Sequence, residues 1–498
     1  MNLAEAFGFC AQTHAATPAV FWGDRKITYA ELLAQSKAVA DRLQTEFAVK
    51  PGDRVGLWLK NCPEYIPALF GVWLAGGVVV PINNFLKPDE VGHILNDAEI
   101  DCLLTQQSFA EFLPALATKR ASLNFFHAEE FETLPTKEDA RKPATARKEI
   151  DLACIIYTSG TTGRPKGAML SHGNLLHNVE SCRQVLAAVD HDRFVVMLPM
   201  FHSFMLCVGI LLPLNVGGSI VLIKSLHPPK NCLQEIIAHG ATILPAIPQF
   251  YRMLLEAHVP AELPVRLCIS GAAPLPVETL KAFAQKFSAP LIEGYGLSEA
   301  SPVVSMNPIH GERKPGSIGR PIPDVEVSVQ DEAGKLLDDG QVGEICVRGG
   351  NVMLGYWNQP AETAKALRGG WLLTGDVGYR DADGFFYITD RKKDMLLVNG
   401  INVYPREIEE AIYRFPGVKE AAVVSQPDAR RGEQPVAFVA ASDNASLLEK
   451  ELIQFLRARL ADYKVPRRVH FVSALPRNAT GKILKTMLRQ QLARADGE

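Results

Sequence analysis

The chain has 498 residues, of which 47% are hydrophobic and 21% are charged, and its formal net charge is −3. This composition disfavours a disordered chain, and it excludes a collagen-like or low-complexity one because the 38 Gly and 33 Pro have no period. The length predicts about three folding units of roughly 100–200 residues each.

The charge is unevenly distributed along the chain. Residues 1–390 carry 33 basic and 42 acidic side chains, whereas residues 391–498 carry 19 basic and 13 acidic ones. A basic last part predicts an anionic partner. We expect this partner not to be nucleic acid, because the aromatic and basic residues of this part do not interleave as in a stacking platform.

The nine cysteines are widely spaced and form no zinc-like cluster, which predicts free thiols in a reducing, cytoplasmic setting. The N-terminus lacks the basic and apolar stretches of a secretory signal. Two apolar runs, 66–82 and 194–223, are interrupted by Gly, Pro, His or Asn residues. They predict buried helices and strands rather than membrane spans, and peripheral membrane contact stays open.

Apolar, β-rich runs separated by helix-length stretches predict an α/β fold with layers and parallel sheet. The runs occupy residues 54–59, 77–82, 101–105, 219–223 and 266–270. Between about 316 and 390 the pattern changes to short strands with Gly and Asp turns, which predicts a small antiparallel or barrel-like part.

A second domain is predicted after Asp390. The charged run RKKD is followed by a strand, an Asn-Gly turn and an amphipathic helix that begins at Pro405. More strands and helices follow, so this part reads as a small α+β domain. We expect a large N-terminal domain over 1–390 and a small, mobile C-terminal domain over 391–498.

The stretch Tyr157 to Gly167, YTSGTTGRPKG, follows an apolar strand and combines glycines, hydroxyls and a lysine. Glycines let a ligand approach the backbone, and the hydroxyls and lysine donate hydrogen bonds and charge to a polyphosphate. The stretch matches neither a Walker A loop nor GxGxxG. By composition alone it could equally be an ordinary flexible loop.

Three further sites carry candidate chemistry. Tyr295 is flanked by glycines and followed by Ser298 and Glu299, a pattern suited to a stacked purine and to Mg²⁺, which takes oxygen ligands. Asp376 follows a Gly turn and could accept two ribose hydroxyls, or could be a simple turn residue. Lys482 lies in a loop of small residues, where a lone lysine is ordinarily a solvated charge.

The order of these stretches closely resembles the adenylate-forming superfamily, which includes acyl-CoA synthetases, amino-acid-adenylating domains and luciferases. YTSGTTGRPKGAMLSH is similar to its phosphate loop. The resemblance continues in order through LPMFHSF, ISGAAPLP, EGYGLSEASPVVSMNP, WLLTGDVGY, DRKKDMLLVNGINVYPREIEE and LPRNATGKILK. The chain looks most like a bacterial-type fatty-acid–CoA ligase.

The resemblance implies roles for individual residues. ATP or AMP would contact Thr158, Ser159, Gly160, Thr161, Thr162, Gly163, Lys166, Gly271, Ala272, Ala273, Glu293, Gly294, Tyr295, Gly296, Ser298, Asp376 and Arg391. Glu299 and Thr161 would hold Mg²⁺, and Lys482, His202 and Glu299 would be catalytic. Lys393 would be the hinge, and Gly400 would let the pantetheine of coenzyme A pass.

The implied reaction joins a carboxylate to ATP, giving acyl-AMP and pyrophosphate, and then transfers the acyl group to a thiol. Coenzyme A is the expected acceptor, because no room remains after Lys482 for a carrier domain, and its phosphates suit the basic last part. An enzyme that loads a separate carrier protein remains an alternative. So does a silent nucleotide-binding or membrane-associated protein with the same fold, and we expect a monomer or homodimer.

The acid is sought in the segments that the family uses for its pocket, Pro199–Leu206, Ala246–Arg252 and Gly296–Ser305. They are mostly apolar, PMFHSFML offers no carboxylate for an amino-acid ammonium group, and Arg252 is their only Lys or Arg. This predicts an apolar monocarboxylate, with a medium- or long-chain fatty acid ahead of an aryl acid.

Overall fold

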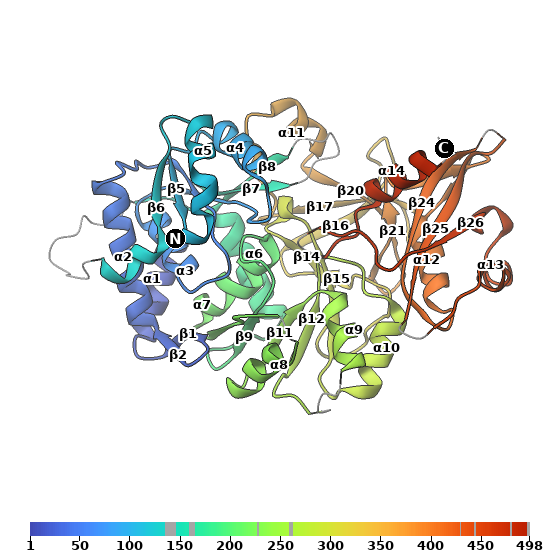
Figure 1. Cartoon of the computed structure of the whole chain (residues 1–498), viewed down its shortest axis with the longest axis horizontal. Helices are drawn as coiled ribbons and strands as arrows, with labels where there is room; N and C mark the ends of the chain where they lie inside the picture. The colour runs from blue at the N-terminus through green and yellow to red at the C-terminus, as the bar shows by residue number, and fades with distance from the viewer. Residues whose placement is uncertain are drawn as a thin grey trace.

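The computed structural model describes residues 1–134, 146–158, 165–226, 229–257, 262–428, 430–442, 445–478 and 481–495. These residues form four β-sheets, and Figure 1 shows the chain running from the N-terminal layers to the C-terminal part at the opposite end of the long axis.

The largest sheet has nine strands in the order β15-β14-β13-β12-β11-β9-β10-β1-β2. Its middle strands, from β13 to β1, are parallel, and antiparallel strands flank them on both sides. The bounds are β1 (Pro18–Trp22), β2 (Arg25–Thr28), β9 (Arg193–Val196), β10 (Ser219–Leu222), β11 (Ile243–Ala246), β12 (Leu267–Ser270), β13 (Leu291–Gly296), β14 (Val303–Met306) and β15 (Arg320–Pro321).

The second sheet has seven strands in the order β18-β8-β7-β4-β3-β5-β6. Strands β7, β4, β3, β5 and β6 are parallel, and β8 turns back beside β7. The bounds are β3 (Arg54–Leu57), β4 (Val78–Pro81), β5 (Cys102–Thr105), β6 (Asn124–His127), β7 (Leu152–Thr158), β8 (Lys166–Ser171) and β18 (Gly355–Tyr356).

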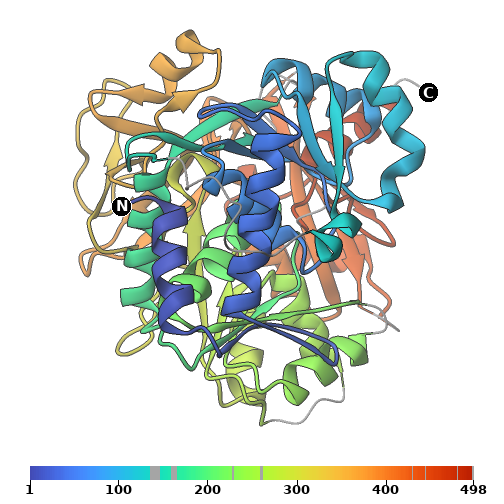
Figure 2. The ribbon, with the colours of Figure 1, turned by 90° about the vertical axis from the view of Figure 1, so that its left-hand side faces the viewer.

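One set of helices packs between these two sheets and forms the largest apolar core with their inner faces. These helices are α1 (Leu3–Thr13), α2 (Tyr29–Thr45), α3 (Tyr65–Leu74), α6 (His172–Val185), the π-helix η4 (Met205–Leu211) and α7 (Leu212–Val216). In Figure 2, which is seen from the left-hand side of Figure 1, the dark-blue helices near the N-terminus lie toward the viewer.

Further helices cover the outer faces. Helices α8 (Pro229–Ala238), α9 (Pro248–Glu256) and α10 (Val277–Lys286) share a core with the nine-stranded sheet, and α4 (Pro88–Asp97) and α5 (Leu113–Lys119) share one with the seven-stranded sheet. The sequence of β4 is continuously apolar because both faces of the strand are buried. Val79 packs in the central core, and Val78 and Val80 pack in the core between the seven-stranded sheet and its outer helices. The layered α/β fold that the sequence predicts is confirmed.

The third sheet confirms the small antiparallel part. It contains β16 (Val325–Gln330), β17 (Gly343–Gly349), β19 (Leu367–Arg368), β20 (Trp371–Arg380) and β21 (Phe386–Arg391), and each of its pairings is antiparallel. Helix α11 (Pro360–Ala366) precedes β19.

A fourth sheet follows Arg391. It contains β22 (Leu396–Val398), β23 (Ile401–Val403), β24 (Val418–Asp428), β25 (Gly432–Ala441) and β26 (Arg468–Phe471), and its helices are α12 (Pro405–Tyr413), α13 (Glu449–Arg457) and α14 (Lys485–Ala495). Asn399 and Gly400 both have positive φ, 52° and 77°, as a two-residue hairpin turn requires. The domain boundary near 390 and the mobility of this part stay predictions.

Both apolar runs that raised the question of a membrane span are buried. Residues 66–82 form most of α3 and then β4, and residues 194–223 run from β9 through η4 and α7 to β10. Within the described ranges, none of the helices has the length and apolar character needed to cross a bilayer.

Candidate active site

The predicted phosphate loop connects two antiparallel strands. Strand β7 ends at Thr158 and β8 begins at Lys166, and these two residues are paired in register. The predicted ligands Ser159, Gly160, Thr161, Thr162 and Gly163 lie outside the described residues. The structure therefore fixes the two ends of the loop.

Lys166 is held at one of these ends by two residues that the sequence analysis did not single out. Its ammonium forms an ion pair with Glu362 of α11 and lies 5.2 Å from the ring centroid of Tyr356. The Tyr356 hydroxyl donates to the Glu299 carboxylate over 2.9 Å. Tyr356 thus lies between the predicted phosphate-binding lysine and the predicted magnesium ligand.

Three predicted nucleotide contacts meet around one buried carboxylate. Asp376 on β20 is only 3% exposed, and its Oδ2 accepts a 2.6 Å hydrogen bond from the hydroxyl of Tyr295 on β13. Its Oδ1 lies 3.0 Å from Nε of Arg391, the last residue of β21. Since β20 and β21 pair Asp376 with Arg391 in register, the third sheet positions this group.

The two predicted segments that follow β12 and β13 lie beside the segment around His202. Ser298 begins the short 3₁₀-helix η5 (Ser298–Ala300), which also contains Glu299. The Oγ atom of Ser298 lies 3.2 Å from the Oγ atom of Ser203. A Cβ on Gly271 would lie 3.1 Å from Cζ of Phe204, so the glycine permits this ring to pack closely. Ala272 and Ala273 continue the turn, and Ala272 has a φ of +64°.

Glu293 on β13 supports the loop that follows β12. Its Oε1 accepts a 3.0 Å hydrogen bond from the backbone N–H of Leu275 and lies 3.9 Å from the Arg406 guanidinium. Burial raises the pKa of Glu293 to about 7, although Arg406 acts in the opposite direction. Next along β13, Gly294 and Gly296 flank Tyr295, and a Cβ on Gly296 would meet the Pro302 carbonyl oxygen at 2.2 Å.

Lys482 belongs to the last part of the chain but lies against this group. Its loop packs on the first part, because a Cβ on Gly481 would lie 2.5 Å from Cδ1 of Ile247. The surrounding protein and the positive charge of Arg391 lower the pKa of Lys482 to about 8, opposed by Asp376. By its surface area Lys482 as a whole residue is nonetheless exposed to solvent.

His202 lies close to Lys482. Burial, and then the positive charge of Lys482, lower the pKa of His202 to about 4. At neutral pH its imidazole is therefore uncharged, and its Nδ1 accepts a 3.3 Å hydrogen bond from the backbone N–H of Phe204. A neutral ring at this point adds no positive charge beside Lys482 and Arg391.

The lowered pKa of Lys482 predicts a pH dependence. The cation is the useful form for an anionic transition state, and it is lost as pH rises through the folded-state pKa of about 8. We therefore expect kcat/KM for adenylation, which reports the free enzyme, to fall at pH values above about 8. Lys482→Arg, whose guanidinium stays charged, should be less active at its maximum but should lack this fall. An unchanged fall in that variant contradicts the assignment to Lys482.

The remaining predicted positions lie at turns. Lys393 is exposed in the turn between β21 and β22, next to Asp394, which Arg489 holds at 2.6 Å. A Cβ on Gly400 would meet no atom within 4 Å, so the β22–β23 hairpin presents this glycine to open space. The hinge and coenzyme A roles of these two residues stay predictions.

The carboxylate of Glu299 fits a magnesium site of the kind in which the ion is bound partly by the protein and partly by the nucleotide. Among the described residues, no three His, Cys, Asp or Glu side chains gather as a metal site of their own. Mg²⁺ usually binds through one or two carboxylates together with substrate phosphates, and Glu299 is a carboxylate that Tyr356 connects to Lys166 at the end of the predicted phosphate loop. When bound, the ion would neutralise charge on those phosphates.

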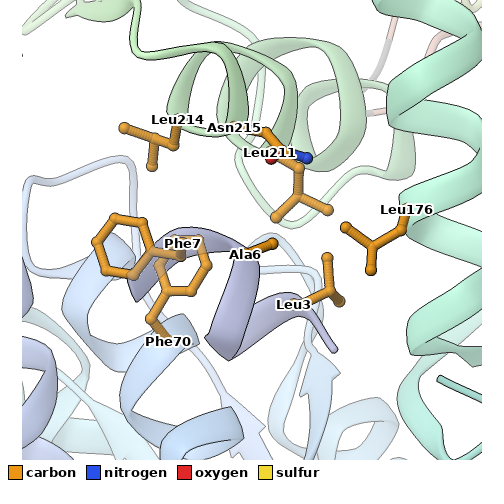
Figure 3. Close-up of a pocket in the computed structure, with 8 residues that line it drawn as sticks. All are labelled: Leu3, Ala6, Phe7, Phe70, Leu176, Leu211, Leu214 and Asn215. Atoms are coloured by element: carbon orange, nitrogen blue, oxygen red, sulfur yellow. The ribbon is translucent and has the colours of Figure 1, made fainter. Parts of the chain in front are cut away.

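A small apolar cavity lies apart from this group. Figure 3 shows it between α1, α3, α6 and the η4–α7 segment, and it is lined by Leu3, Ala6, Phe7, Phe70, Leu176, Leu211, Leu214 and Asn215. None of these eight residues is among the predicted site residues. The cavity therefore belongs to the central core rather than to the nucleotide group.

Comparison with known proteins identifies the family. The model described as "AMP-binding enzyme" matches residues 8–357, and that of the "AMP-binding enzyme C-terminal domain" matches residues 407–482. A long-chain-fatty-acid–CoA ligase of Bacillus subtilis is 37% identical over 95% of this chain and 91% of its own length. A feruloyl-CoA synthase of an Amycolatopsis species is 37% identical over 95% of each chain.

Solved structures agree with this assignment. ATP-bound MatB from Rhodopseudomonas palustris has a TM-score of 0.91 and 33% identity, covering 99% of each chain. The anthranilate CoA ligase AuaEII, in complex with anthranoyl-AMP, has a TM-score of 0.92 and 28% identity, covering 99% of this chain and 98% of its own. With a matching fold and a family model over most of its length, the chain belongs to the AMP-binding enzyme family.

Proposed function

We propose that the protein activates a medium- or long-chain fatty acid as acyl-AMP and transfers the acyl group to coenzyme A. The protein is an acyl-CoA ligase of the adenylate-forming type, with ATP, Mg²⁺ and coenzyme A as its further reactants. The identity of the acid and the roles of the individual residues are the proposal.

The observation that carries the mechanism is the position of Lys482 beside Asp376, Arg391 and His202. In adenylation a carboxylate approaches the α-phosphate of ATP, and two anions repel one another unless a positive charge lies between them. Lys482 supplies that charge, while Asp376 holds the ribose and Lys166 exchanges Glu362 for the phosphates. Donors fixed in place before the reaction stabilise developing charge without having to reorganise.

The reaction has two displacement steps. A carboxylate oxygen attacks the α-phosphorus, the bond to the bridging oxygen breaks, and pyrophosphate leaves. The coenzyme A thiolate then attacks the acyl carbonyl carbon, and AMP leaves. For the second step we propose that residues 391–498 turn about Lys393, withdraw Lys482 and bring the Gly400 hairpin to the site.

The choice of acid rests on the apolar character of the predicted pocket segments. The helix η4, which continues the segment around His202, is buried and apolar along its whole length. Arg252, the only Lys or Arg in these segments, pairs with Glu420 instead of facing an acid site. A second carboxylate on the substrate would therefore lack a cation here. Among the relatives, the fatty-acid–CoA ligases support an alkyl chain, and the feruloyl-CoA synthase keeps an aryl acid as the alternative.

A substrate panel tests this choice. Purified protein is incubated with ATP, Mg²⁺, coenzyme A and one acid from hexanoate to palmitate, or benzoate or cinnamate, and AMP release is followed. We expect the highest kcat/KM with an alkyl acid of eight or more carbons, since each buried CH₂ contributes ~0.8 kcal/mol of binding. A higher value with benzoate or cinnamate contradicts the fatty acid. Acyl-AMP that forms but is not consumed with coenzyme A supports the carrier-loading alternative instead.

We also propose a reducing, cytoplasmic location. All nine cysteines are free thiols, eight of them are buried, and only Cys62 is partly exposed. Unpaired buried thiols are typical of proteins that work in the reduced compartment of the cell.

A further inference from the structure

A buried carboxylate outside the nucleotide group joins the two parts of the chain. Glu420 on β24 is 5% exposed, and three side chains reach its Oε1. Two come from α9 in the first part: Arg252 Nη2 at 2.5 Å and Gln249 Nε2 at 3.3 Å. The third is Arg477 Nη2, at 3.0 Å, from the loop that leads to Lys482. One carboxylate oxygen therefore binds both α9 and the lysine loop.

The same arginines also hold the backbone on either side. Arg252 donates to the carbonyl of Lys419, and Arg477 donates to the carbonyl of Gly481, the residue directly before Lys482. The loop is closed further by Lys482 N–H, which donates to the Asn478 side chain over 2.9 Å. Hydrogen bonds therefore tie the residues before the loop, Arg477 and Asn478, to Gly481 and Lys482 after it. Arg477 in turn ties this loop to Glu420.

We infer that Glu420 is a positioning residue for Lys482, which it holds in the adenylation arrangement by pairing Arg477 and Arg252 at once. This inference rests on the proposed function. Glu420 does not touch the nucleotide group; it acts through Arg477 on the lysine loop and through Arg252 on α9. Without its charge, two guanidinium groups would face each other in a poorly solvated site, and the docked arrangement would be disfavoured.

The contacts predict an unequal effect on the two half-reactions. Lys482 must lie at the site for adenylation, whereas thioester formation from ready-made acyl-AMP does not need it there. Loss of the Glu420 charge should therefore slow the first half-reaction alone. A small displacement of a catalytic group costs about 10²-fold in rate, so a reduction of about 10–100-fold is expected.

The test measures both half-reactions in Glu420→Gln and Arg252→Gln. Arg252→Gln removes the charged link to α9 but keeps the Gln249 hydrogen bond and the Arg477–Glu420 pair, and at 21% exposure the Arg252 side chain tolerates replacement more easily. We expect acid-dependent exchange of pyrophosphate into ATP to fall about 10–100-fold through kcat, with the KM for ATP nearly unchanged. Thioester formation from acyl-AMP and coenzyme A should stay within about threefold, and the double variant should fall less than the product of the single effects.

Glu407→Gln is the matched control, because Glu407 pairs with Lys464 entirely within the last part of the chain and on its surface. It should leave both half-reactions unchanged. Equal loss of the two half-reactions in Arg252→Gln, or no loss in either, overturns the inference while the wild type remains active. A wild type without acid-dependent exchange for any acid contradicts the proposed function itself, and the inference with it.

Discussion

Replacing Lys482 with alanine is expected to lower the rate of adenylation by about 10²–10³-fold, the usual cost of removing one preorganised group that stabilises developing charge. The Lys482 side chain lies within electrostatic reach of both Asp376 and Arg391. Acid-dependent exchange of pyrophosphate into ATP measures this step directly. Thioester formation from supplied acyl-AMP should stay within about threefold of wild type, because the charge at the α-phosphate is needed only before pyrophosphate leaves.

Lys450→Ala serves as the control, since Lys450 is exposed at the start of α13 in the same part of the chain. It should leave both half-reactions unchanged. Should Lys482→Ala slow both half-reactions to the same degree, the lysine would be a general support of the site rather than the group that enables adenylation.

Replacing Asp376 with asparagine is expected to raise the KM for ATP by about 10–100-fold, because hydrogen bonds to a charged group contribute about 1.5–3 kcal/mol. The substitution keeps the size of the side chain, but it removes the charge that Arg391 and Tyr295 now share. Unlike Lys482→Ala, it should also weaken thioester formation, since acyl-AMP carries the same ribose. Titration of AMP binding and the KM for ATP in the exchange assay measure the effect.

Asp339→Asn is the matched control. Asp339 lies at the surface and pairs with Arg380, which is on β20 like Asp376. It should leave AMP binding unchanged. Normal AMP affinity in Asp376→Asn is incompatible with a ribose contact at this position.

The parts of the fold that depend on local pattern were predictable from the sequence. Continuous apolar runs become the parallel strands β3, β4, β5, β10 and β12, because each is buried on both faces. Pro405 begins α12, since a proline fits the first turn of a helix. The change of pattern after about 316 marks the antiparallel third sheet, whose turns need Gly and Asp.

Contacts between distant segments were not predictable from the residues alone. Tyr356 reaches Glu299 across 57 positions, and nothing in the Gly-Tyr pair at β18 indicates a partner. The π-helical form of Met205–Leu211 has no pattern of its own, because every residue in it is apolar and buried. Arg252 belongs to an apolar segment that the sequence analysis assigns to the acid pocket. Its partner Glu420 lies on β24 of the fourth sheet, far away in the sequence. Only the docking of the two parts determines where Arg252 points.

Exchange of labelled pyrophosphate into ATP, in the absence of coenzyme A, tests the central claim most directly. The account predicts exchange that requires Mg²⁺ and a fatty acid, followed by stoichiometric release of AMP and formation of acyl-CoA when coenzyme A is added. Release of ADP and phosphate instead of AMP and pyrophosphate, or AMP release with no exchange under any acid, would contradict it.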